Sequence, residues 1–76
     1  MSSLLHTDKV FEKTEQLPAG DFEGCRFLHC NFGGADLSGI NFTECEFDNC
    51  NLSTAKIIQT TFNDVKFIQS KLLGLH

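Results

Sequence analysis

Large apolar side chains recur at every fifth residue from Phe22 onward. The series is Phe22, Phe27, Phe32, Leu37, Phe42, Phe47, Leu52, Ile57, Phe62, Phe67 and Leu72. A second series lies two residues before each of these and is mostly small or thiol-bearing, while the other positions are polar or glycine in most repeats. A helix returns to one face every 3.6 residues and a strand every 2, so neither keeps this period on one side. The pattern therefore excludes a continuous helix or strand.

The chain must turn once in each five-residue repeat. Within one repeat, the small and the large residue are two positions apart and share the inward face of a short strand. Because five is odd, a straight strand would point the next large residue outward. Residues that favour turns stand where the bend is needed, as at 33–34, 38–39 and 48–49. A chain that bends in one sense at every repeat closes into a coil, and identities between residues 20 apart barely favour four sides per coil over three.

The repeat resembles the pentapeptide repeat protein family. Residues Ala35-Asp36-Leu37-Ser38-Gly39 match the consensus A(D/N)LxG, and the runs 25–32, 45–47 and 50–53 resemble its variants CxF and CNL. The resemblance covers about residues 20–74. It implies an all-β fold, a right-handed quadrilateral β-helix with four five-residue sides per coil, and a little under three coils in this chain.

The expected organisation is an N-terminal capping segment, residues 1–19, followed by a β-helix over residues 20–76. The capping segment departs from the register, and we expect Val10, Phe11 and Leu17 to lie over the first layer of phenylalanines. At the other end, Leu75 and His76 begin a twelfth repeat whose central residue is missing. We therefore expect a fragment of a longer repeat protein, or self-association through the uncapped C-terminal coil. The family resemblance favours such a dimer, because members commonly dimerise through terminal coils.

Length and composition indicate one small cytoplasmic domain. The chain has 76 residues, lacks an apolar run long enough for a membrane helix, and opens with a segment too short and polar for a signal peptide. Nothing points to secretion, so Cys25, Cys30, Cys45 and Cys50 are expected to be reduced thiols that fill the small inward position. No membrane association is expected.

No motif for catalysis or for metal binding stands out. The cysteines are spaced by five residues, whereas zinc sites usually space them by two to four. His6, His29 and His76 lack partners at a useful spacing, and His29 falls at an outward turn. There is no phosphate-binding glycine loop and no nucleophile with a matching base. We expect no enzymatic activity, no cofactor and no metal.

Charge is distributed unevenly over the four expected sides. The net charge is −4 with six basic residues, which argues against direct binding to nucleic acid. One side, residues 20–24, 40–44 and 60–64, carries four acids and no base. These candidate partner-binding residues are Asp21, Glu23, Glu44 and Asp64. The second side carries both signs, and the remaining two carry few charges.

An acidic stripe of this kind can imitate a phosphate backbone and attract a DNA-binding protein. The N-terminal half, with its CxFxxC and CNLS variants, resembles quinolone-resistance pentapeptide repeat proteins. That resemblance implies a DNA mimic that binds DNA gyrase or topoisomerase IV and protects it from quinolones. The alternatives are solvated acids on a purely structural repeat segment, or an interaction module without nucleic-acid mimicry. Ile58, Ile68 and Leu73 are outward apolar residues that we expect missing sequence or a second subunit to cover, in preference to a small molecule.

Overall fold

The computed structural model describes residues 4–18 and 20–74, which form eight short strands and no helix. The strands are β1 (Leu5–Thr7), β2 (Val10–Glu12), β3 (Asp21–Glu23), β4 (Arg26–Leu28), β5 (Asn41–Thr43), β6 (Glu46–Asp48), β7 (Thr61–Asn63) and β8 (Lys66–Ile68). Within these described ranges, no helix is long and apolar enough to cross a membrane. The expectation of an all-β fold is confirmed.

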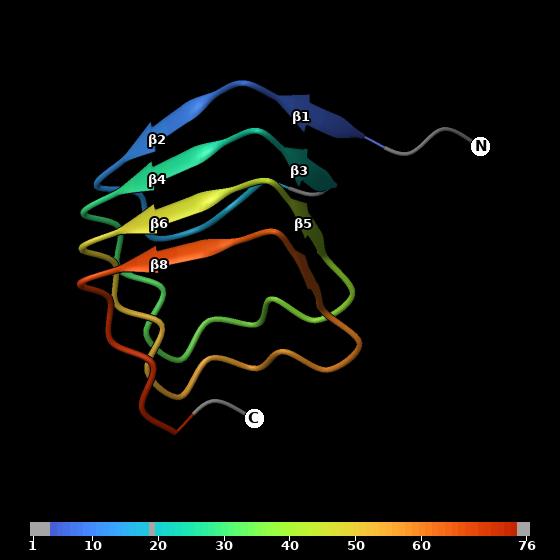
Figure 1. The fold of residues 1–76 in the computed structure, drawn as a ribbon. Coiled ribbons are helices and arrows are strands. Elements are labelled where there is room, and N and C mark those ends of the chain that lie inside the picture. The colour runs from blue at the N-terminus through green and yellow to red at the C-terminus, as the bar shows by residue number, and fades with distance from the viewer. Residues whose placement is uncertain (1–3, 19, 75–76) are drawn as a thin grey trace.

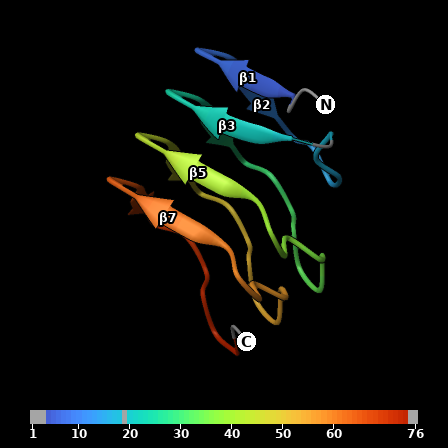
Figure 2. The ribbon, with the colours of Figure 1, turned by 90° about the vertical axis from the view of Figure 1, so that its right-hand side faces the viewer.

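The strands stack into two parallel sheets that form neighbouring sides of a solenoid (Figures 1 and 2). The first sheet has the order β1-β3-β5-β7 and the second β2-β4-β6-β8. In the register, Phe22 pairs with Phe42, and Phe27 pairs with Phe47, each twenty residues later. On the other two sides the coils meet at single bridges, such as Asp36 with Lys56. Twenty residues per coil make four five-residue sides, as predicted.

The large residue of each repeat points inward and builds the core. Those of residues 22–52 are 0–2 % exposed. Along each sheet, phenylalanine rings stack nearly parallel, with centroids 5.5 Å apart for Phe22 and Phe42 and 4.5 Å apart for Phe27 and Phe47. Rings of neighbouring sides meet edge to face, as Phe42 and Phe47 do at 5.3 Å. Both geometries are favoured by the ring quadrupole. The five-residue period therefore stabilises the core through aromatic pairs as well as through burial of apolar surface.

The small residue of each repeat also points inward, and where it is cysteine, threonine or serine its side chain hydrogen-bonds to the coil before it. Cys45 Sγ donates to the carbonyl of Phe22 at 3.4 Å, and Cys50 Sγ donates to that of Phe27 at 3.1 Å. Ser70 Oγ donates to the carbonyl of Phe47 in the same way, at 3.0 Å. All four cysteines are buried and unpaired. This position therefore suits a small side chain that has one weak or strong donor.

The bends between sides are made by residues with positive φ. Glycine occupies some of these positions, and asparagine, aspartate, glutamate, glutamine, threonine, lysine and histidine occupy others. His29 is one of them, with φ 52°, and its side chain is exposed as expected. Where a further coil follows, the amide at the bend donates to it, as from Asn49 to the carbonyl of Ile68 at 2.8 Å. This bond offsets the strain of the left-handed conformation.

The N-terminal segment continues both sheets instead of departing from the repeat. His6 pairs with Phe22 and Phe11 with Phe27, each sixteen residues apart instead of twenty. The Phe11 ring stacks on Phe27 at 5.3 Å, and Leu17 packs against the core. Val10 is 58 % exposed, so the expectation that it covers the core is wrong. It alternates with Phe11 along β2, and only one of two successive strand residues can face inward.

The core is less completely covered at its C-terminal end. Phe62 and Phe67 are only partly buried, and Leu72 is 37 % exposed. Leu75 and His76, the expected start of a twelfth repeat, lie outside the described residues. Self-association through this end stays a prediction.

Candidate functional site

The four predicted acidic residues lie along the first sheet and its bend toward the second. Asp21 and Glu23 begin and end β3, whereas Glu44 and Asp64 follow the last residues of β5 and β7. Glu23 pairs with Thr43, one residue before Glu44. The structure thus brings Glu23, Glu44 and Asp64 together where the strands of the first sheet end, and it places Asp21 where β3 begins.

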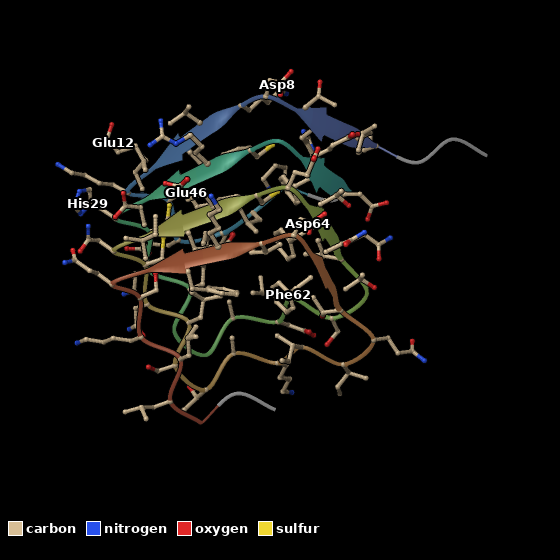
Figure 3. The ribbon with its side chains drawn as sticks, viewed as in Figure 1. Asp8, Glu12, His29, Glu46, Phe62 and Asp64 are labelled. Carbon is tan, nitrogen blue, oxygen red and sulfur yellow. The ribbon has the colours of Figure 1, made fainter. Side chains whose placement is uncertain are left out.

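Glu44 and Asp64 occupy equivalent bends in successive coils, with φ of 52° and 58°. Asp8 occupies the same bend between β1 and β2, with φ 53°. We call Asp8, Glu44 and Asp64 the acidic corner. The amides of Asp8 and Glu44 donate to carbonyls of the next coil at 3.0 and 2.8 Å, and both side chains are exposed. Figure 3 shows Asp8 and Asp64 at the bends of the uppermost and lowermost strand pairs.

Sequence reasoning missed Asp8 because the N-terminal segment was not assigned to the repeat. A signal was present, since His6 and Phe11 are five residues apart and Asp8 follows His6 by two, as Glu44 follows Phe42. His6 concealed that signal, because a central position held by histidine breaks an otherwise apolar series.

Gly24 fills the remaining bend in this column, between Asp8 and Glu44, with φ 67°. A Cβ at residue 24 would lie only 2.5 Å from Asp8 Oδ1. The glycine therefore makes room for the Asp8 carboxylate, which lies against the coil that follows. Because residue 24 has no side chain, the coil that carries it can lie close to the Asp8 carboxylate.

Asp21 has a structural partner that the other candidates lack. Its Oδ1 accepts the backbone N–H of Asn41 at 3.1 Å, and its side chain is half-buried. Glu23, by contrast, is exposed. Of the predicted set, Asp21 thus contributes to coil stacking, while Glu23, Glu44 and Asp64 are presented to solvent.

The second sheet brings two basic residues close to the acidic corner. Arg26, Glu46 and Lys66 are in register on β4, β6 and β8, and Arg26 Nη2 lies 3.6 Å from Glu46 Oε2. Together with Glu44 and Asp64, these residues line a shallow groove of about 430 Å³. The ladder has two bases and one acid, so one positive charge remains beside the acidic corner. Among the described residues, no ion pair joins a carboxylate of the acidic corner to a base.

The described residues offer a binding surface rather than reactive groups. No group of three or more histidine, cysteine, aspartate or glutamate side chains among residues 4–18 and 20–74 could hold a metal ion. Burial raises the pKa of the Cys45 thiol and raises that of Cys50 to about 11. Both thiols therefore stay protonated near neutral pH and are poor nucleophiles.

Comparison with known families matches residues 20–76 to the pentapeptide repeat region. The chain belongs to the pentapeptide repeat family. A comparison with curated proteins gave no match. This pentapeptide repeat protein therefore has the fold of a scaffold or interaction module. Its inward side chains fill the solenoid, and its polar side chains lie on the outer surface.

Proposed function

We propose that this pentapeptide repeat protein is a non-enzymatic binding module whose acidic corner, with Glu23, binds a basic DNA-binding surface on another protein. The observation that supports the proposal is the column of exposed carboxylates at equivalent bends of three coils, interrupted at Gly24. These carboxylates lie at positive φ on a rigid stack, so their spacing is set by the backbone and not by flexible side chains. Preorganised charge of this kind steers association and favours one partner orientation.

The charge spacing supports imitation of one DNA strand rather than of a duplex. Stacked coils are about 4.8 Å apart, the usual distance between neighbouring strands. A DNA strand carries one charge per ~3.4 Å of helix axis, and both strands together one per ~1.7 Å. Asp8 and Glu44 are two coils apart because Gly24 holds the bend between them. The acidic corner is therefore sparser than a DNA strand, and Glu23, which precedes Gly24, partly fills this gap. We expect association that weakens strongly with added salt.

The partner that we propose is a type II topoisomerase, DNA gyrase or topoisomerase IV. The resemblance of the N-terminal repeats to quinolone-resistance pentapeptide repeat proteins supports this choice over other DNA-binding proteins. In this role the solenoid would occupy the basic DNA-binding surface as a DNA mimic and protect the enzyme from quinolones.

The test is protection of gyrase supercoiling against a quinolone, measured with the wild-type protein and with a triple variant, Glu23→Lys, Glu44→Lys and Asp64→Lys. We expect the triple variant to lose protection. Asp21→Asn, which keeps an oxygen acceptor for Asn41, should retain most of it. Circular dichroism would establish that each variant is folded.

The control is a variant in which acids elsewhere on the surface are reversed, Glu12→Lys and Glu15→Lys. It changes net charge in the same direction, and we expect it to protect gyrase like the wild type. If the wild-type protein gives no protection, the topoisomerase proposal is wrong. If control and triple variant lose protection equally, net charge acts and the acidic corner does not.

A second candidate function is an interaction module without nucleic-acid mimicry. It is favoured by outward apolar side chains, since Ile58 is 61 % and Leu73 80 % exposed. A partner bound in this way would be retained at high salt and lost with Ile58→Ser and Leu73→Ser. Binding that follows the opposite pattern would exclude this candidate.

A further inference from the structure

The first coil of the solenoid is shorter than those that follow it. Corresponding residues of the first two strand pairs are sixteen positions apart, compared with twenty in later coils. Figure 1 shows the chain passing almost directly from the end of β2 toward β3, whereas later coils run through two further sides. The first coil has four residues fewer than the later coils, so it does not cover the N-terminal edge of residues 31–39 completely.

The backbone groups on this edge can be counted against the edge on the other side of the same residues. Toward the following coil, the amides of Phe32, Gly34, Leu37 and Gly39 donate to carbonyls at 2.7–3.0 Å, and the carbonyl of Ala35 accepts from Lys56 at 2.8 Å. Toward the N-terminus, only the amide of Asn31 is bound, to the carbonyl of Thr14 at 3.1 Å. The amide of Asp36 and the carbonyls of Gly33, Asp36 and Ser38 have no partner in the described part of the chain.

A groove runs along this open edge. Residues 15–17 form one of its walls and residues 33–37 the other, and its volume is about 510 Å³. Leu17 packs against the core, and Leu37 is only 2 % exposed. The interior is thus already filled beside the groove, and the exposed feature is the row of unpaired backbone groups. An unpaired strand edge is a template for another strand.

We propose that this edge binds an extended basic peptide of a partner protein, added as a parallel strand above residues 33–38. Main-chain hydrogen bonds would repeat those that residues 53–58 already make on the other side. The peptide's inward residue must be small, because Leu17 occupies the interior. This resembles strand addition to an exposed sheet edge, except that the edge here is one side of a coil; backbone bonds give affinity and side chains give specificity.

Charge indicates a basic peptide. The exposed carboxylates of Glu15 and Asp36 line the two walls of the groove. Asp36 already faces Lys56 across the stack on the side toward the following coil. A lysine or arginine at the matching position of the bound peptide would face Asp36 from its open side. The bound peptide would thus repeat the Asp36–Lys56 arrangement on the other side of Asp36.

This inference does not rest on the acidic corner, because the groove lies on the two sides of the solenoid that carry no sheet. The probe is a fluorescein-labelled peptide with the sequence of residues 51–60, with Leu52→Ala and Ile57→Ala to fit the filled interior. We expect saturable binding by fluorescence anisotropy. Hydrogen exchange of the Asp36 amide, which is unpaired in the free protein, should slow on binding.

Variants separate charge from backbone pairing. Replacing the peptide's lysine, Lys56→Glu, or making Glu15→Lys in the protein should weaken binding about two- to five-fold per charge removed. Asp36→Asn should also weaken it, while keeping the acceptor for the amide of Ser38, which lies at 3.0 Å from Asp36 Oδ1. Glu12→Lys, which lies on β2 away from the groove, is the matched control and should leave binding unchanged.

A four-residue insertion after Thr14 should complete the short coil and abolish binding, because the protein's own chain would then pair with the edge. Circular dichroism shows whether this variant is folded, and the charge variants test the proposal independently of it. Binding that survives the insertion in a folded variant, or an Asp36 amide that exchanges at the same rate with peptide, would overturn the proposal. Concentration-dependent protection of Asp36 without peptide would overturn it in favour of a second copy of the chain.

Discussion

Two phenylalanines in the same stacked column should differ in their contribution to stability. Phe27 lies between two rings, with centroids 5.3 Å from Phe11 and 4.5 Å from Phe47, and is 0 % exposed. Phe67 stacks on Phe47 alone, at 5.2 Å, and is partly exposed. Phe27 also meets three rings edge to face, whereas Phe67 meets one. The chemistry, the sheet and the position in the repeat are the same, so the comparison measures the effect of being enclosed by neighbouring rings.

The expected difference follows from these contacts. Truncating a buried phenylalanine to alanine costs about 3–5 kcal/mol in unfolding free energy, through lost transfer energy and the cavity left behind. Each aromatic pair adds about 0.5–1.5 kcal/mol beyond area burial. Phe27→Ala loses one more stacked pair and two more edge-to-face pairs than Phe67→Ala, and it opens an enclosed cavity instead of an open one. We therefore expect Phe27→Ala to cost at least about 1 kcal/mol more.

The measurement is urea unfolding followed by circular dichroism, with both variants at one protein concentration. If Phe27→Ala does not fold, Phe27→Leu and Phe67→Leu give the same comparison with smaller cavities. Equal losses at the two positions would refute the reasoning, because they would show that stacking on a second face contributes nothing. A larger loss at Phe67 would indicate that the C-terminal end is covered in solution.

Three further predictions concern the thiols, the bends and the C-terminal end. Burial raises the pKa of Cys50 from 9.0 to about 11. The protonated thiol therefore contributes fully to the free energy of unfolding below pH 9, and this contribution is lost as pH rises through about 11. The loss is at most about 2.7 kcal/mol, measured by urea unfolding against pH, and Cys50→Ser should reduce it while keeping a donor for the core. Gly24→Ala should destabilise the protein more than Gly39→Ala, since both have positive φ but only residue 24 meets Asp8, and Asp8→Ala should remove the difference. Sedimentation equilibrium should show a dimer that Leu72→Glu dissociates, and a wild-type monomer at the highest concentration would make self-association wrong.

The candidate site was predictable only in part. Glu44 and Asp64 could be placed together because they stand in the same position of repeats twenty residues apart. Asp8 could not, because its repeat precedes the regular series and its coil is four residues shorter. The sequence also did not show that Arg26 and Lys66 lie close to Glu44 and Asp64. Charges were counted separately for each side of the coil, and such a count ignores the bend at which two sides meet. The hydrogen bond from Asn41 to Asp21 likewise depends on where one coil lies over the next.

The sequence by itself determined the inside of this protein. Each repeat buries its own large and small residue, so the inward direction is a local property that a period of five expresses at every step. Only the tertiary structure decided how the N-terminal segment stacks, because residues 13–18 carry no periodic signal and their path depends on closing the first coil over Leu17. The place of Asp8 in the acidic corner and the open edge at residues 31–39 both follow from that closure. Surface positions are set by which coil lies on which, and that is a long-range relation that no single repeat encodes.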